Sequence, residues 1–126
     1  MCYLYHKLYK MNFQKFTVKA AEAVQEAQQL AQANQHSTID VSHLLLAMIK
    51  QNDGFVPGLI KKSGSTTQAV EQIVLQDMNK LPRVQGNAQI SITQALNTAF
   101  NEAEKIMQSM GDQYLTTEHL FLAILA

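Results

Sequence analysis

The sequence predicts an all-α domain that contains two copies of one helical unit. The helix formers Ala, Gln and Leu dominate the composition, whereas Gly and Pro number only 5 and 2. The chain also matches itself when Thr17 is placed on Thr93, a shift of 76 residues. With 126 residues, the chain has the size of a single domain.

The internal repeat aligns residues 17–50 with residues 93–126 without a gap and gives nine identical pairs in 34 positions. Its most specific part is H-L-x-L-A, which occupies 43–47 and again 119–123. Each copy opens with apolar residues spaced three or four apart, which is typical of an amphipathic helix. A second helix follows a short loop in each copy, with Asp40 or Thr116 as its N-cap. It is apolar on nearly every side, so we expect it in the core.

Polar residues and glycines predict the helix ends. Ser91 with Gln94, and Ser65 with Gln68, have the spacing of a capping box and would open two of the helices. Gly111 suits the left-handed position just after a helix. No segment alternates apolar and polar residues convincingly, so we expect no sheet.

The segment between the copies predicts two more helices. Pro57 suits the first turn of a short helix that Gly64 ends. Pro82 then ends a second helix by about Leu81. The apolar positions of this second helix are Val70, Ile73, Val74 and Met78.

These elements divide the chain into a first repeat at about 16–81, a polar linker at 82–91 and a partial second repeat at 92–126. Residues 1–10 fall outside the repeat, so we assign the domain to 11–126. A full second repeat would need about 30 residues more than this sequence holds, so we expect the second repeat to be truncated. An abnormal apolar patch would then remain at Leu120, Phe121, Ile124 and Leu125.

The composition excludes several function classes. Lys and Arg number 10 and Asp and Glu number 10, so we expect neither nucleic-acid nor membrane binding. Cys2 is the single cysteine, which excludes an intramolecular disulfide and a cysteine-based zinc site and favours the cytoplasm. The chain has no P-loop and no nucleophile elbow. We therefore expect no catalytic residues, no cofactor and no metal. His43 and His119 are expected to pack structurally, and His36 to be exposed.

Five motifs together resemble the N-terminal Clp repeat domain, and most closely that of the ClpB-type AAA+ disaggregases. They are FTVKAAEA (16–23), the paired H-L-x-L-A cores, DGFVPGLI (53–60), LPRVQG (81–86) and GDQYLTTEHLFLAIL (111–125). The resemblance implies a non-catalytic module of eight helices in a cytoplasmic hexamer, joined to AAA+ modules. It also implies that the module captures unfolded or aggregated polypeptides.

The resemblance suggests substrate-binding residues: Thr17, Asp112 and Glu118 as a patch, and Ile106 lining an apolar groove. Each has a structural alternative. Thr17 would cap a helix, Asp112 would stabilise a turn, Glu118 would favour a helix N-terminus, and Ile106 would belong to the core. Two other functions stay open: an adaptor-docking domain of a ClpA/ClpC-type unfoldase, and a stand-alone Clp-repeat accessory protein.

Overall fold

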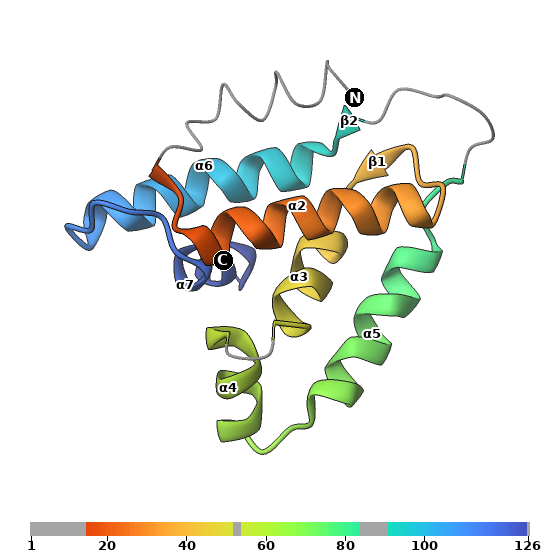
Figure 1. Ribbon diagram of the computed structural model, residues 1–126, viewed down its shortest axis with the longest axis horizontal. Coiled ribbons are helices and arrows are strands. Elements are labelled where there is room, and N and C mark those ends of the chain that lie inside the picture. The colour runs from red at the N-terminus through yellow and green to blue at the C-terminus, as the bar shows by residue number, and fades with distance from the viewer. Residues whose placement is uncertain (1–14, 52–53, 84–90, 126) are drawn as a thin grey trace.

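The computed structural model describes residues 15–51, 54–83 and 91–125, and the fold is all-α as the composition predicts. The predicted extension at 1–10 and most of the predicted linker lie outside these residues. Figure 1 shows the described elements, which follow one another in this order: α2 (Val18–Ala33), β1 (Thr38–Ile39), α3 (Val41–Ile49), α4 (Phe55–Lys62), α5 (Thr67–Asn79), β2 (Ser91–Ile92), α6 (Gln94–Ser109) and α7 (Thr117–Leu125).

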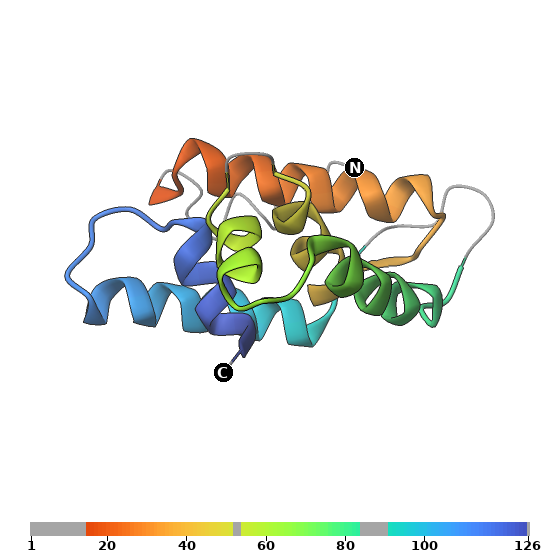
Figure 2. The same cartoon turned by 90° about the horizontal axis from the view of Figure 1, so that it is seen from below.

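The two long helices, α2 and α6, run antiparallel (Figure 1), and Figure 2 shows them on opposite sides of the molecule with α3 and α7 between them. The faces of α2 and α6 predicted from apolar spacing are the buried ones, except that Met110, which the spacing assigned to the buried face of α6, is 51% exposed. On α2 the buried residues are mostly alanines, which lets α3 approach closely. The core also holds large, fully buried apolar side chains from α3, α5, α6 and α7: Leu44, Leu46, Met48, Met78, Leu96 and Leu120.

Helices α4 and α5 follow the prediction, with two corrections. Pro57 lies in the first turn of α4, and Gly64 follows that helix with φ of 91°. The N-cap of α5 is Thr66, whose hydroxyl accepts from the Ala69 N–H, so the predicted capping box at Ser65 was wrong by one residue. Ile73 was also assigned to the wrong face, because its side chain is 62% exposed.

The start of the second repeat needs a similar correction. Thr93, and not Ser91, is the N-cap of α6, and its hydroxyl accepts from the Leu96 N–H at 3.2 Å. Ser91 lies in β2, which pairs in parallel with β1, with Thr38 opposite Ser91 and Ile39 opposite Ile92. The expectation that no strands would form was therefore wrong, although the ladder is only two residues long.

The predicted apolar patch on α7 is only partly present. Leu120 is fully buried, and Phe121 and Ile124 are partly buried and pack against the core. Helix α4 of the first repeat and helix α2 both contact α7, which explains the burial that the repeat pattern did not predict (Figure 2). Leu125 is 65% exposed as expected.

Candidate functional site

The backbone just before α2 pairs with the backbone just before α7. Phe16 forms a parallel bridge with Leu115, and the Thr17 N–H donates to the Leu115 carbonyl at 2.9 Å. Leu115 lies in the middle of the segment that contains Asp112 and Glu118. The fold therefore brings three predicted site residues from opposite ends of the sequence to one region (Figure 1).

An equivalent backbone pairing forms at the start of α6. Adding 76 to Thr17 gives Thr93, whose N–H donates to the carbonyl of Ile39 at 3.1 Å, and Ile39 is the counterpart of Leu115. Each repeat thus supplies one strand-like segment to the other. The Thr93 hydroxyl also donates to the Asp40 carboxylate at 2.8 Å, which ties the two repeats together by a charge-assisted hydrogen bond.

Thr17 is the N-cap of α2. Its backbone is extended, and its hydroxyl accepts from the Ala20 N–H at 3.2 Å, so the structural role considered for this residue is present. The ring of the preceding Phe16 lies 6.2 Å from the ring of Phe100 on α6, which anchors the start of α2. The next side chain, Val18, points outward and is 75% exposed.

Asp112 follows a Schellman turn at the end of α6. Gly111 has φ of 73°, and its N–H donates to the Gln108 carbonyl while the Asp112 N–H donates to the Met107 carbonyl at 3.0 Å. This turn directs the Asp112 carboxylate toward His119, whose Nε2 lies 2.8 Å from Oδ2. The carboxylate is half exposed, so the remaining oxygen is available to solvent or a ligand.

His119 fixes the start of α7. Its Nδ1 accepts from the Thr116 N–H at 2.9 Å, and the His119 backbone N–H donates to the Thr116 hydroxyl at 3.4 Å. This is a capping box in which His replaces the usual Glu or Gln at the third helical position. His43 does the same for α3, accepting from the Asp40 N–H at 2.9 Å. Both histidines are buried, as their structural assignment predicts.

Glu118 lies in the first turn of α7 and is partly exposed. A negative charge is favoured there by the helix dipole, whatever its further role. With Asp112 it gives the 112–118 segment two carboxylates. Ile106 lies on α6, is partly buried and packs against the core, which is the structural alternative considered for it.

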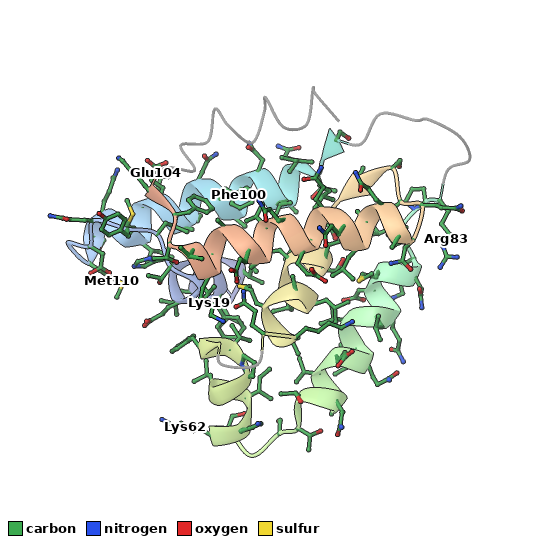
Figure 3. All side chains as sticks on the ribbon, viewed as in Figure 1. Lys19, Lys62, Arg83, Phe100, Glu104 and Met110 are labelled. Carbon is green, nitrogen blue, oxygen red and sulfur yellow. The ribbon has the colours of Figure 1, made fainter. Side chains whose placement is uncertain are left out.

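Three apolar side chains at the start of α2 and in the α6–α7 segment are exposed although the sequence did not predict this. Val18, Met110 and Tyr114 are 75%, 51% and 58% exposed. Figure 3 shows Met110 at the far end of α6, on the side of the molecule where the α6–α7 loop begins. The signal was available in the sequence, because Val18 interrupts the apolar spacing of its helix. We call Thr17, Val18, Met110, Asp112, Tyr114 and Glu118 the junction surface.

The prediction that His36 is exposed was wrong, because its side chain is 1% exposed. The C-terminal turn of α2 carries it inward, and its Nδ1 lies 2.8 Å from His43 Nε2. Burial is the main cause that lowers the pKa of both rings, that of His43 to about 4. The nearby Arg83 guanidinium lowers the pKa of His36 further, whereas the Asp40 carboxylate acts in the opposite direction on His43.

Two hollows among the described residues lie away from the junction surface. One hollow of about 480 Å³ lies at the α4–α5 turn, and another of about 300 Å³ lies between α2 and α3, and neither is lined by a junction residue. Within residues 15–51, 54–83 and 91–125, no three His, Cys, Asp or Glu side chains are placed to hold a metal ion. The arrangement offers an open surface with apolar contacts and two carboxylates, which suits binding of a polypeptide.

Known proteins are similar to this chain in both sequence and fold. The family model for the Clp repeat (R) N-terminal domain matches residues 15–126. Chaperone protein ClpB of Nitratidesulfovibrio vulgaris is 31% identical over 119 residues, covering 91% of this chain and 14% of the relative. ClpB of Bacteroides thetaiotaomicron is 32% identical over 115 residues, with coverages of 91% and 13%.

Among solved structures, the Hsp104 N-terminal domain from Candida albicans superposes with a TM-score of 0.79 at 26% identity, covering 88% of this chain and 73% of that one. A complex of a ClpV N-domain with a VipB peptide gives a TM-score of 0.77 at 20% identity, with coverages of 90% and 69%, and shows the same fold.

The chain spans about one seventh of the length of its curated ClpB relatives. None of the helices in the described part of the chain is long and apolar enough to cross a bilayer. The family match over residues 15–126, together with the repeated helices and the backbone pairings between the repeats, shows that this chain belongs to the Clp repeat N-terminal domain family.

Proposed function

We propose that this chain is the client-binding N-terminal domain of a ClpB-type chaperone. In this role the junction surface holds exposed segments of unfolded or aggregated polypeptides before AAA+ modules of a hexamer thread them. The observation that carries the proposal is the Thr17–Leu115 pairing, which joins the start of α2, with exposed Val18, to the α6–α7 segment, with exposed Met110 and Tyr114. The ClpB and Hsp104 relatives support the parent class.

Apolar side chains on an open surface fit the chemistry of such clients. A non-native polypeptide exposes apolar segments without a fixed sequence, so its receptor gains affinity from apolar area and adaptable contacts. Met110 is flexible and polarisable, which favours contact with varied side chains. Asp112 and Glu118 add preference for segments that carry Lys or Arg beside apolar residues. Ile106 would extend the apolar contact from α6.

The test measures binding of a permanently unfolded probe, such as reduced and carboxymethylated lactalbumin, by fluorescence anisotropy. Val18→Ser and Tyr114→Ser each remove an apolar contact of about 1–2 kcal/mol, so each should weaken binding by about 5–30-fold. Asp112→Asn keeps an oxygen acceptor for His119 and removes the charge. It should weaken binding of basic probes more than that of acidic ones.

Matched controls lie on α5, well away from the junction surface (Figure 1). Ile73→Ser removes an equally exposed apolar side chain, and Asp77→Asn removes an exposed carboxylate. Both should leave binding unchanged. Equal losses in junction and control variants, or no binding by the unaltered chain, would contradict the proposal.

A second candidate is docking of a defined partner segment, as in an adaptor-binding N-domain. The solved complex of a ClpV N-domain with a VipB peptide favours it, because that domain has the same fold. The two candidates differ in sequence selectivity. A client receptor should bind scrambled versions of a binding peptide about equally well, whereas an adaptor site should lose at least about tenfold in affinity on scrambling.

A further inference from the structure

The first repeat contains a buried histidine pair whose protons are fixed by its neighbours. The exposed fractions of His36 and His43 are 1% and 0%, and His36 Nδ1 lies 2.8 Å from His43 Nε2. His36 follows the C-terminal turn of α2, and His43 is the third residue of α3. The pair therefore joins the end of one helix to the start of the next.

The backbone determines the tautomer of each ring. The Asp40 N–H donates to His43 Nδ1 at 2.9 Å, so Nδ1 carries no proton and the proton of His43 is on Nε2. That Nε2–H then donates to His36 Nδ1, which leaves the proton of His36 on its own Nε2. Both rings are neutral in this arrangement, and only this placement satisfies both hydrogen bonds.

An additional proton has no favourable position in this pair. On His43 Nδ1 it would face the Asp40 N–H, and on His36 Nδ1 it would face the His43 Nε2–H. His36 Nε2 is buried and has no hydrogen-bond partner among the described residues. The charged groups that face the pair are Asp40, whose carboxylate already accepts from Thr93 and Ser42, and Arg83, which opposes a second positive charge.

The second repeat has the same geometry with a different first residue. Asp112 stands at the position equivalent to His36, and its carboxylate accepts from His119 Nε2 at 2.8 Å. The group beside the histidine Nε2 is therefore a carboxylate in repeat two, which only accepts, whereas in repeat one it is a second imidazole, which can itself take up a proton.

We propose that the His36–His43 pair is an acid-sensitive switch that loosens the first repeat when it is protonated. Protonation breaks the capping box of α3 and separates the α2 terminus from α3. The neighbouring Asp40–Thr93 hydrogen bond and the β1–β2 pairing connect this site to the second repeat, so the contact between repeats weakens with it. The pair thus couples proton concentration to the rigidity of the whole module.

The difference in pKa between the folded and the unfolded chain determines how stability changes with pH. The pKa of His43 lies at about 4 in the fold and at about 6.5 in the unfolded chain, so the unfolded chain takes up the proton first. The contribution of the pair to stability is complete above about pH 7.5, falls as the pH drops from 6.5 toward 4, and is lost below. At pH 5 this raises the unfolding equilibrium constant about 30-fold, which lowers the melting temperature by about 6–10 °C.

The experiment compares melting of the 126-residue chain at pH 7.5 and pH 5 for the wild type, His36→Asp and Asp112→His. His36→Asp copies repeat two into repeat one and places a carboxylate near Arg83, so its melting temperature should fall by about 6–10 °C less than that of the wild type. Asp112→His creates a second histidine pair, so its melting temperature should fall further than that of the wild type between pH 7.5 and pH 5. Equal decreases in all three proteins would overturn the proposal.

A second measurement does not depend on the variants folding. Nitrogen-15 histidine spectra of the wild type should show both His36 and His43 protonated at Nε2 only at pH 7.5, with His43 still neutral at pH 5. A proton on His43 Nδ1 at pH 7.5, or a charged His43 at pH 6, would overturn the proposal.

Discussion

Replacing Leu120 with alanine should strongly destabilise the domain, because this side chain of α7 is completely buried between α2, α4 and the rest of the core. Leucine has three more carbons than alanine, so the lost transfer free energy is about 2.4 kcal/mol. The cavity left in a core of packed helices adds to this, giving a total of about 3–5 kcal/mol. For a chain of this length the melting temperature should fall by about 10–20 °C.

Leu122 provides the matched control, since it lies on the same helix and is 38% exposed. The same substitution there removes a side chain that already contacts water and leaves no closed cavity, so the loss should stay below about 1.5 kcal/mol. Thermal and urea unfolding measure both variants. Equal losses for Leu120→Ala and Leu122→Ala would refute the burial of α7 and restore the exposed patch that the repeat pattern suggested.

Two further predictions concern helix ends. Thr93→Ala removes both the cap of α6 and the hydrogen bond to Asp40, so urea unfolding should show a loss of about 1–2 kcal/mol, against about 0.5–1 kcal/mol for Thr66→Ala at the exposed cap of α5. A Thr93→Ala loss no larger than that of Thr66→Ala would mean that the inter-repeat bond contributes nothing. Gln35→Gly should stabilise by about 0.5–1 kcal/mol, because Gln35 holds φ of 58° where the second repeat has Gly111. Gly111→Ala should destabilise by a similar amount. A destabilising Gln35→Gly or a stabilising Gly111→Ala, measured by calorimetry, would contradict the left-handed geometry.

The repeat in the sequence was sufficient to predict α2, α3, α6 and α7 and most of their buried faces. The spacing of apolar residues is a local property of each helix. The same spacing occurs in two segments 76 residues apart, so the two copies of the pattern support each other. The helix starts were predicted less well, because Ser91 and Thr93, or Ser65 and Thr66, are equally good caps by residue type. Which one caps depends on the backbone, and at Ser91 the pairing with β1 requires an extended conformation.

The contacts between the repeats could not be predicted, because they join residues far apart in the sequence and a local pattern does not contain them. No spacing in the sequence indicates that Phe16 pairs with Leu115, or that α4 covers α7. The surface assignment of His36 was wrong because the turn that ends α2, in which Gln35 has φ of 58° and the His36 N–H donates to the Ala31 carbonyl at 2.9 Å, directs His36 inward. The shift places His36 opposite Asp112, and both precede a repeated histidine by seven residues, which was the available signal.

The most direct test of the proposed function is the footprint of an unfolded polypeptide on this chain. Amide chemical shifts of the labelled protein, followed while carboxymethylated lactalbumin is added, report each contacted residue. Client binding at the junction surface predicts the largest changes at residues 16–19 and 110–118, with little change along α5. Changes concentrated on α5 or at the α4–α5 hollow, or no changes at millimolar probe, would contradict the account.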